Sequence, residues 1–327
     1  MKEKLLKIFA EHSDQFVSGE KISQQLGCTR TAVWKHIDEL RKNGYELESA
    51  PRKGYRLIRK GDGIHSHEVK VGLTTKRIGH EITYFDETDS TQYTAHKLAQ
   101  EGAKEGHVVI ANEQTKGKGR LGRQWFSRKG TSVSMSLILR PELPPQKTPQ
   151  LTLLTAVSVV RGLKKATGID CDIKWPNDIL INGKKLVGIL TEMQADPDRV
   201  NSIIIGIGMN INQHHDDFTP EIRELATSVA LVKGKNVDRA KIIAAVLNEF
   251  EQLYDLYIER GFDLIRPLWE AHSVSVGTFI YARTMREVIY GFAKGITEDG
   301  VLLLEDEKGK VHEIYSADIE IASQADS

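Results

Sequence analysis

The sequence feature that most restricts the fold is a basic, glycine-rich run at residues 114–125, with four Lys and Arg residues and no acidic one. Its three glycines match the GxGxxG spacing of dinucleotide-binding loops, which connect a strand directly to a helix. Residues 107–111 predict the preceding strand, but residues 131–139 alternate with the period of a second strand, not of a helix. The run therefore connects two strands. Its glycines and cations suit it to binding a phosphate or a carboxylate, the alternative being a mobile basic hairpin tip.

The composition is that of an ordinary folded protein, with 40% hydrophobic and 28% charged residues in 327, enough for two or three domains. The net charge is zero, so any basic surface is local; residues 1–65 carry 13 Lys and Arg against 9 Asp and Glu. Cys28 and Cys171 lack metal-binding spacing, and we expect them to be reduced in the cytoplasm. Paired histidines without accompanying carboxylates or thiolates predict no metal site. No signal-peptide pattern or membrane-spanning run is present, so no membrane partner is expected.

The N-terminal residues predict a winged helix-turn-helix. Apolar residues recur at helical spacing over residues 2–12, 20–26 and 29–42, with a glycine turn before the third helix. Residues 45–58 form a basic hairpin in the position of a wing. Such a domain reads DNA with its recognition helix, usually as a two-fold dimer, the alternative being a protein-interaction module. The residues expected to contact DNA are Thr29, Arg30, Thr31, Lys35, Arg52 and Lys53.

Two hydroxyl side chains, Ser90 and Thr91, precede a helix predicted at residues 93–100. One interpretation is that they cap this helix. Hydroxyl groups at a helix start can also bind the polar head of a small ligand, and Gln114 would then be a suitable amide partner. The nearby glycine-rich run favours the ligand-binding interpretation.

A hairpin is predicted over residues 180–192, because the dipeptide Asn182-Gly183 is a strong two-residue turn signal. Lys185 falls on the returning strand among apolar residues. A lysine there costs free energy unless it meets an anion or reaches solvent along its stem, so Lys185 is a candidate functional residue. Residues 203–212 predict another buried strand, which ends in two asparagines suited to a nucleobase.

Five segments, in this order, resemble the motifs of biotin protein ligases. With the winged helix-turn-helix in front, the whole chain is similar to the bifunctional class, which also represses the biotin operon. The ordered set is far more specific than the glycine pattern alone. The segments are residues 89–91, 117–125, 174–178, 185–190 and 208–212.

The resemblance implies an α+β multidomain protein. Residues 1–63 would form the winged helix-turn-helix, residues 64–272 an α/β ligase domain related to class II aminoacyl-tRNA synthetases, and residues 273–327 an SH3-like β-barrel. Short alternating segments agree with such a barrel. The strands expected in it are residues 278–282, 288–293, 301–305 and 311–315.

The resemblance also implies a two-step reaction. The biotin carboxylate attacks the α-phosphate of ATP, with Mg²⁺ bound through the nucleotide, and gives biotinyl-5′-AMP and pyrophosphate. A lysine of a biotin carboxyl carrier protein domain then displaces AMP. Positioning and charge stabilisation are the main requirements of such chemistry, so cationic side chains and backbone donors can carry it. The adenylate-bound protein is expected to dimerise and to repress transcription at operator DNA.

Particular residues inherit roles from the resemblance. The sequence departs from the usual family pattern at two positions: Lys118 replaces an arginine, so that a bidentate donor pair is lost, and Gln92 replaces an asparagine. The expected catalytic residues are Lys185, Arg120 and Asp178, the last as a base for the attacking lysine. The expected biotin-binding residues are Ser90, Thr91, Gln114, Gly117, Lys118 and Lys185. The expected ATP- and adenylate-binding residues are Arg120, Arg123, Trp125 and Asn210.

Two other functions fit parts of the sequence. A DNA-binding regulator could sense a nucleotide without turning it over, although Lys185 and the charged loop argue against this. A ligase for lipoate or octanoate would share the fold. The polar set Ser90, Thr91 and Gln114 favours a cyclic urea over an aliphatic chain.

Overall fold

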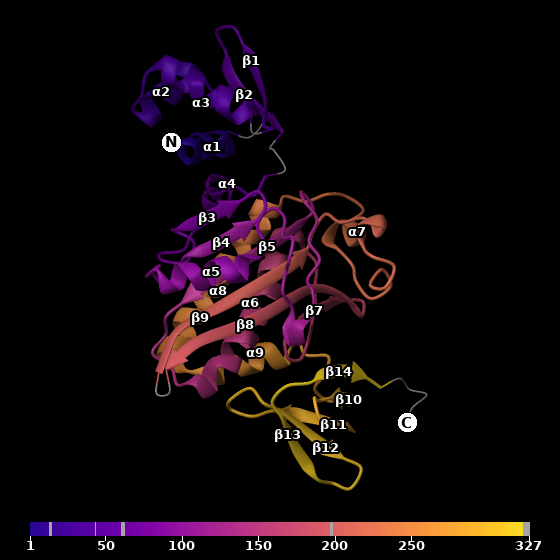
Figure 1. Ribbon diagram of the computed structural model, residues 1–327. Coiled ribbons are helices and arrows are strands. Elements are labelled where there is room, and N and C mark those ends of the chain that lie inside the picture. The colour runs from indigo at the N-terminus through magenta and orange to yellow at the C-terminus, as the bar shows by residue number, and fades with distance from the viewer. Residues whose placement is uncertain (13–14, 43, 60–62, 197–198, 323–327) are drawn as a thin grey trace.

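The computed structural model describes residues 1–12, 15–42, 44–59, 63–196 and 199–322. Three sheets divide the chain into three parts, with the N-terminal part and the C-terminal sheet at opposite ends of the molecule (Figure 1). The predicted α+β organisation is confirmed. The sequence Gly61-Asp62-Gly63 predicts a short linker after the winged helix-turn-helix, and of these residues only Gly63 lies within the described part of the chain.

The N-terminal part is the predicted winged helix-turn-helix. Ser18 accepts a hydrogen bond from the Lys21 N–H (3.1 Å) and starts α2, and Gly27 ends this helix in the left-handed conformation (φ 62°). The apolar residues form a core separate from that of the rest of the chain. Trp34, which suits either a core or an interface, is 54% exposed. The elements are α1 (Lys2–Glu11), α2 (Gly19–Leu26), α3 (Arg30–Lys42), β1 (Glu46–Ala50) and β2 (Gly54–Arg59).

The central part is a seven-stranded mixed sheet of order β3-β4-β5-β9-β8-β7-β6, with α5 on one face and α6 and α8 on the other (Figure 1). Alternate residues of β5 face opposite sides: Val133 and Met135 join the core under α6 and α8, so Ser134 and Ser136 face the side of α5. The strands are β3 (Ile82–Phe85), β4 (Val108–Ala111), β5 (Ser132–Leu139), β6 (Asp172–Lys174), β7 (Asp178–Ile181), β8 (Lys184–Asp196) and β9 (Arg199–Asn210). The helices are α4 (Ser66–Val71), α5 (Thr91–Gln100), α6 (Thr148–Thr167), α7 (Val229–Lys233), α8 (Arg239–Arg260) and α9 (Arg266–Glu270).

Local sequence explains most of these boundaries. The hairpin between β7 and β8 turns at Asn182 and Gly183, with φ of 50° and 76°, as predicted. The apolar run at residues 151–167 predicts a helix, and α6 covers this run. The helix begins earlier, at Thr148, because Pro149 fits the first turn, where no N–H is needed. Strand β9 ends at Asn210, so Asn212 lies beyond the strand that was expected to contain it.

The C-terminal part is a five-stranded antiparallel sheet of order β13-β12-β11-β10-β14. The sequence predicts four of these strands but not β14, whose alternating acidic and apolar residues are too few to stand out. Strand β14 pairs with β10, and the inner side chains of the sheet belong to the same hydrophobic core as α6 and α8. The strands are β10 (Phe279–Arg283), β11 (Val288–Ile296), β12 (Leu302–Asp306), β13 (Val311–Ile314) and β14 (Asp318–Ile321).

Candidate active site

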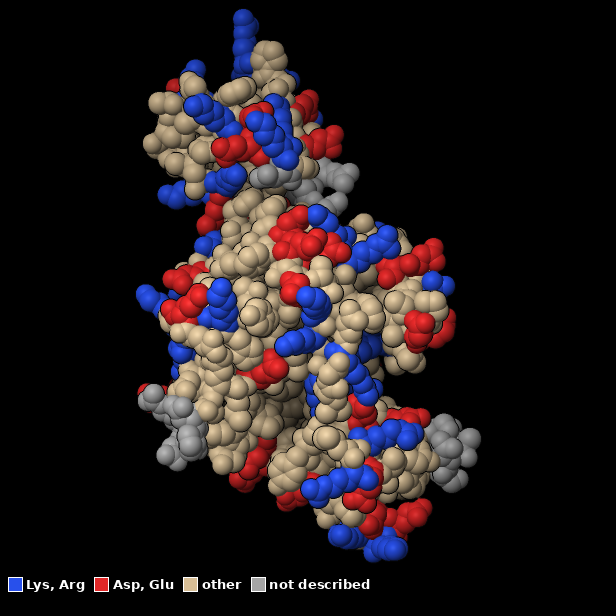
Figure 2. All heavy atoms as spheres, viewed as in Figure 1, with Lys and Arg blue, Asp and Glu red and all other residues tan. Residues whose placement is uncertain are grey.

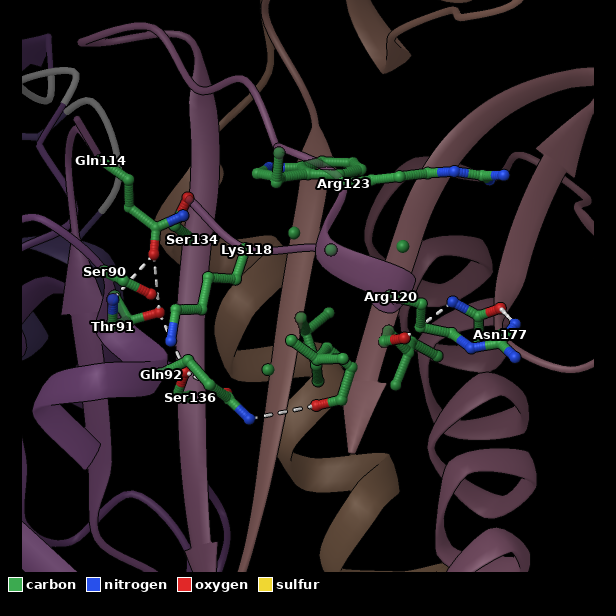
Figure 3. A pocket seen from close by; sticks show the side chains of 18 of the residues that line it. Ser90, Thr91, Gln92, Gln114, Lys118, Arg120, Arg123, Ser134, Ser136 and Asn177 are labelled. Atoms are coloured by element: carbon green, nitrogen blue, oxygen red, sulfur yellow. Dashed lines mark hydrogen bonds between the residues drawn. The ribbon is translucent and has the colours of Figure 1, made fainter. Parts of the chain in front are cut away.

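The predicted site residues converge on a cavity of about 130 Å³ above β5, β9 and β8. The start of α5 forms one wall, and the glycine-rich loop at residues 114–125 extends over it (Figure 3). Gly117 and Asn210 do not line this cavity, whereas the other predicted ligand-binding and catalytic residues do. Those that do are Ser90, Thr91, Gln114, Lys118, Arg120, Arg123, Trp125, Asp178 and Lys185.

The start of α5 brings Ser90 and Thr91 to Gln114. The backbone N–H and the hydroxyl of Thr91 both donate to Gln114 Oε1, at 2.7 and 3.0 Å. Ser90 occupies the N-cap position, but its buried hydroxyl makes no capping hydrogen bond and has no partner among the described residues. The capping interpretation is therefore wrong for Ser90. Among the described residues nothing uses this hydroxyl, so it is available for a further hydrogen bond.

The floor of the cavity consists of small residues at matching positions of three neighbouring strands. Ser134 of β5 lies opposite Gly208 of β9, which lies opposite Gly188 of β8. A Cβ atom at Gly208 would come within 2.4 Å of the Trp125 ring, and one at Gly188 within 3.0 Å. Both glycines are therefore needed for the indole to lie flat against the sheet.

Gln92 closes one end of the cavity, and its carboxamide is used within the protein. Its Nε2 donates to the carbonyl oxygens of Ile204 (3.1 Å) and Leu190 (3.4 Å), and its Oε1 accepts from the hydroxyl of Ser136 (3.0 Å). A Cβ atom at Gly206 would come within 2.6 Å of the same Oε1. The departure at position 92 thus ties α5 to the central sheet.

Hydrogen bonds between its own backbone groups close the loop over the cavity. The Trp125 N–H donates to the Gly117 carbonyl (2.9 Å), and Gly119 donates to the Arg123 carbonyl (2.7 Å). A Cβ atom at Gly117 would come within 2.4 Å of the Trp125 carbonyl oxygen, so a larger residue here would clash with the other end of the loop. Lys118 points into the cavity from the loop (Figure 3).

The loop also contacts the C-terminal sheet, a relationship that the sequence does not reveal. Arg120 donates to Asn177 Oδ1 (2.9 Å) and to Ser316 Oγ (2.8 Å), and Arg123 pairs with Asp318 at the start of β14. Burial lowers the pKa of the Arg120 guanidinium, an effect that the charges of Asp178 and Asp318 oppose. The C-terminal part therefore completes one wall of the cavity.

Lys185 and Asp178 form an ion pair at this wall, with Nζ 2.7 Å from Oδ1. The lysine meets an anion, as its position on the strand requires, and 38% of its side chain stays exposed. Its backbone is held on both sides, because its N–H donates to the Leu225 carbonyl (2.8 Å) and its carbonyl accepts from the Thr227 N–H (2.9 Å). The ammonium lies 5.9 Å from the centre of the Trp125 ring.

Asn210 lies away from this group. It is buried, and its Oδ1 accepts a hydrogen bond from Gln213 Nε2 (3.1 Å). The side chains of this site to which the sequence assigns no role are Gln92, Ser134, Ser136, Asn177, Ser316 and Asp318. A strand in which serines alternate with apolar residues was the available signal for Ser134 and Ser136.

The predicted DNA-contacting residues lie on the surface of the winged helix. Thr29 caps α3 by accepting from the Ala32 N–H (3.2 Å), and Arg30 pairs with Glu20 (2.8 Å). Arg52 and Lys53 are exposed at the turn of the wing, and Thr31 and Lys35 are exposed on α3. Figure 2 shows Lys and Arg side chains distributed over this part, with several acidic ones among them.

The described part of the chain offers no group of three or more His, Cys, Asp or Glu side chains arranged for a metal ion. Both cysteines are free. Within the same residues, no helix is long and apolar enough to cross a membrane.

Three family models match the chain. The model of the biotin/lipoate A/B protein ligase family matches residues 84–210, an HTH domain matches residues 2–56, and the biotin protein ligase C-terminal domain matches residues 282–321. The matches fall on the central, N-terminal and C-terminal parts of the fold respectively.

Similar proteins extend over the same three parts. The bifunctional ligase/repressor BirA of Bacillus subtilis is 53% identical, over 98% of this chain and 98% of its own length. The protein of the same name from Escherichia coli is 28% identical, over 93% of this chain and 92% of its own. The solved biotin protein ligase of Aquifex aeolicus in complex with biotin and ATP is 30% identical, covers 74% of this chain and 99% of its own, and has a TM-score of 0.64.

Proposed function

The chain belongs to the biotin protein ligase family, in its bifunctional ligase/repressor class, and on this premise we propose how its residues divide the work. It is an ATP-dependent biotin–protein ligase, and its winged helix-turn-helix makes it a DNA-binding repressor as well. The observation that best supports the division of roles is the convergence of Ser90, Gln114, Arg120 and Lys185 on one cavity.

The hydroxyls of Ser90 and Thr91 and the amide of Gln114 bind the urea of biotin. Gln114 Oε1 accepts two hydrogen bonds from Thr91, which turns its Nε2 donor away from the helix and towards a ligand carbonyl. A urea has one acceptor and two donors, so a set of hydroxyls and one amide matches it. An aliphatic chain would leave the Ser90 hydroxyl unsatisfied, at a cost of roughly 1–3 kcal/mol.

The cationic side chains at the other end bind the carboxylate and the phosphates. Lys118, Arg120 and Arg123 descend from the loop, and Lys185 approaches from β8. The biotin carboxylate attacks the α-phosphorus of ATP, the bond to pyrophosphate breaks, and charge develops on the phosphoryl oxygens in the transition state. Lys185 and Arg120 stabilise that charge because their positive charges lie beside it when the loop is closed.

Asp178 acts in the second step. The nitrogen of the acceptor lysine forms a bond to the biotinyl carbon, AMP leaves, and the amine must lose a proton. Once Lys185 turns to the anionic adenylate, the carboxylate that it releases becomes the base for this proton. Trp125 provides an apolar wall for the adenylate, and Asn210 contacts the adenine after the segment that follows β9 rearranges.

The loop opens for the ligand to enter. The cavity of about 130 Å³ is smaller than the roughly 300–1,000 Å³ of typical small-molecule pockets. The loop at residues 114–125 is the part able to move, because its Leu121 is 55% exposed and its contacts to β14 are made by an exposed Arg123. The docking of this loop on the C-terminal sheet then separates the reaction from solvent.

The proposal extends to partners and to domain boundaries. The acceptor is a biotin carboxyl carrier protein domain, and the adenylate-bound protein binds a palindromic operator as a homodimer. Mg²⁺ arrives with ATP, since Asp178 and Asp318, the carboxylates that line the cavity, are each paired with a cation. Free cysteines and a requirement for ATP favour the cytoplasm. The separate core of the winged helix supports a domain at residues 1–63, and the separate sheet of the C-terminal part supports the division into residues 64–272 and 273–327.

The decisive experiment combines the full chain with ATP, Mg²⁺, biotin and a purified carrier domain. Mass spectrometry should detect one biotin on a carrier lysine, and lipoate in place of biotin should give none. Transfer of lipoate but not of biotin would contradict the proposed substrate. Adenylate formation without any transfer would contradict the assigned acceptor.

The repressor half has its own assay. A gel shift with palindromic operator DNA should strengthen when biotin and ATP are added, and ultracentrifugation of the same mixture should show a dimer. Equal DNA binding with and without the substrates would contradict ligand-dependent repression.

A further inference from the structure

The uncharged polar side chains on the α5 side of the cavity fall into two groups. Those of Thr91, Gln92 and Ser136 hydrogen-bond to one another, to Gln114 or to backbone carbonyls. The hydroxyls of Ser90 and Ser134 are buried and have no hydrogen-bond partner among the described residues. Ser90 is already assigned to the substrate. Ser134 has no role in the proposed function.

Backbone groups fix the orientation of the first group at two points. None of its side chains can therefore rotate to form a hydrogen bond with the Ser134 hydroxyl. The Thr91 N–H fixes Gln114 Oε1, and the carbonyls of Ile204 and Leu190 fix the Nε2 of Gln92. With Nε2 committed to those carbonyls, Gln92 Oε1 faces Ser136 and takes the Ser136 proton.

Ser134 lies where it would contact a ligand bound on the floor of the cavity. It belongs to the same row as Gly208 and Gly188, over which the Trp125 indole lies. Figure 3 shows Ser134 on the side of the cavity that holds Gln114, Ser90 and Thr91, opposite Arg120 and Asn177. The indole N–H of Trp125 is also buried without a hydrogen-bond partner. Two polar groups without a hydrogen-bond partner among the described residues therefore line the part of the cavity that the loop covers.

A buried hydroxyl without a partner destabilises the folded chain, because it loses its hydrogen bond to water and gains none. A serine that served only to fill space would be better replaced by alanine. We infer that Ser134 is a further substrate-binding residue, whose hydroxyl contacts the cyclic urea of biotin once the loop moves. The inference rests on biotin as the substrate of this cavity.

The test compares Ser134→Ala with wild type in two measurements on the full chain. In the ligand-free protein, the variant should unfold at a higher temperature, by on the order of 2 °C. In calorimetric titration with biotin, the same variant should lose affinity by about tenfold. A purely structural serine would move stability and affinity in the same direction or leave affinity unchanged.

Ser132→Ala is the matched control. Ser132 lies on the same strand and the same face and is equally buried, but its hydroxyl donates to the Arg128 carbonyl (3.3 Å) and it does not line the cavity. We expect this variant to keep the affinity for biotin and to unfold at an equal or lower temperature than wild type.

A second ligand identifies the contacted group. Desthiobiotin keeps the urea and lacks the sulfur, so the loss of affinity in Ser134→Ala should be as large for desthiobiotin as for biotin. A loss that vanished with desthiobiotin would overturn the assignment to the urea. Wild-type affinity for biotin in Ser134→Ala, or a lowered unfolding temperature, would overturn the inference while the proposed function stood. A wild-type chain that bound no biotin would overturn both.

Discussion

The ammonium of Lys185 lies 2.7 Å from the carboxylate of Asp178, on the neighbouring strand of the β7–β8 hairpin. The side chain of Asp178 is 16% exposed and that of Lys185 is 38% exposed, so each satisfies the charge of the other before any substrate is present. The two residues proposed for the two chemical steps are therefore held as a pair. A change in one releases the other.

Lys185→Ala should reduce the rate of adenylate formation by roughly 10²–10³-fold, the usual effect of removing one preorganised charge from a transition state. Pyrophosphate release measures this step. Lys184→Ala is the control, because Lys184 precedes Lys185 on the same strand and pairs with Glu224 at the surface (3.3 Å). Normal turnover in Lys185→Ala, with circular dichroism unchanged, would contradict the assigned role.

Asp178→Asn should form the adenylate but transfer biotin slowly, since an amide cannot accept the proton of the acceptor amine. Single-turnover transfer from purified biotinyl-5′-AMP isolates this step. Raising the pH should restore part of the rate, because bulk solvent then deprotonates the lysine. A transfer rate equal to that of wild type at neutral pH would argue against a base at this position.

Asp318→Asn should weaken the docking of the loop on β14, because Arg123 then loses its ionic partner. Arg123 is 66% exposed, and exposed ion pairs contribute only about 0.2–1 kcal/mol, so we expect KM for ATP to rise by roughly fivefold at most. Glu320 lies on the same strand as Asp318 and forms an exposed pair with Arg283 of β10, so Glu320→Gln should leave KM unchanged. Equal effects of the two substitutions would show that general charge, and not loop docking, is responsible.

Lys53→Ala, at the turn of the wing, should lower the affinity for operator DNA and for random DNA by similar factors. A phosphate contact carries no base information, and its loss should lower the slope of log K against log salt by about one. Fluorescence anisotropy over a salt series checks both points. A loss confined to the operator would instead assign Lys53 to base recognition.

His67 should make the junction between the winged helix and the central part sensitive to acid. Burial, together with the positive charges of His65, Lys2 and the N-terminus, lowers the pKa of His67 from 6.5 to about 4. The folded protein favours the neutral ring, so this contribution to stability is present above pH 6.5 and is lost as the pH falls towards 4. Between pH 7 and pH 5, the unfolding temperature of wild type should fall more than that of His67→Phe. Parallel curves for the two proteins would contradict the prediction.

Local sequence by itself determined most of the elements and the identity of several site residues. Caps and turns such as Ser18, Gly27 and the Asn182-Gly183 pair act over two to four residues, and strand or helix periodicity is written along the chain. The order of the motifs likewise needs no coordinates. The sequence alone therefore predicts the three-part organisation, and it predicts one site that contains Ser90, Gln114, Arg120 and Lys185.

Tertiary structure alone decided how those residues are partnered. Thr91 meets Gln114, Gln92 meets the carbonyls of β8 and β9, and Arg123 meets Asp318, a separation of 195 residues in the last case. Strand β14 was missed because four residues of alternating character become a strand only when β10 offers them an edge. The unsatisfied state of Ser134 is likewise a property of the packed neighbourhood. Whether a hydroxyl has a partner depends on groups that folding brings together from distant strands, and no local pattern records their distances.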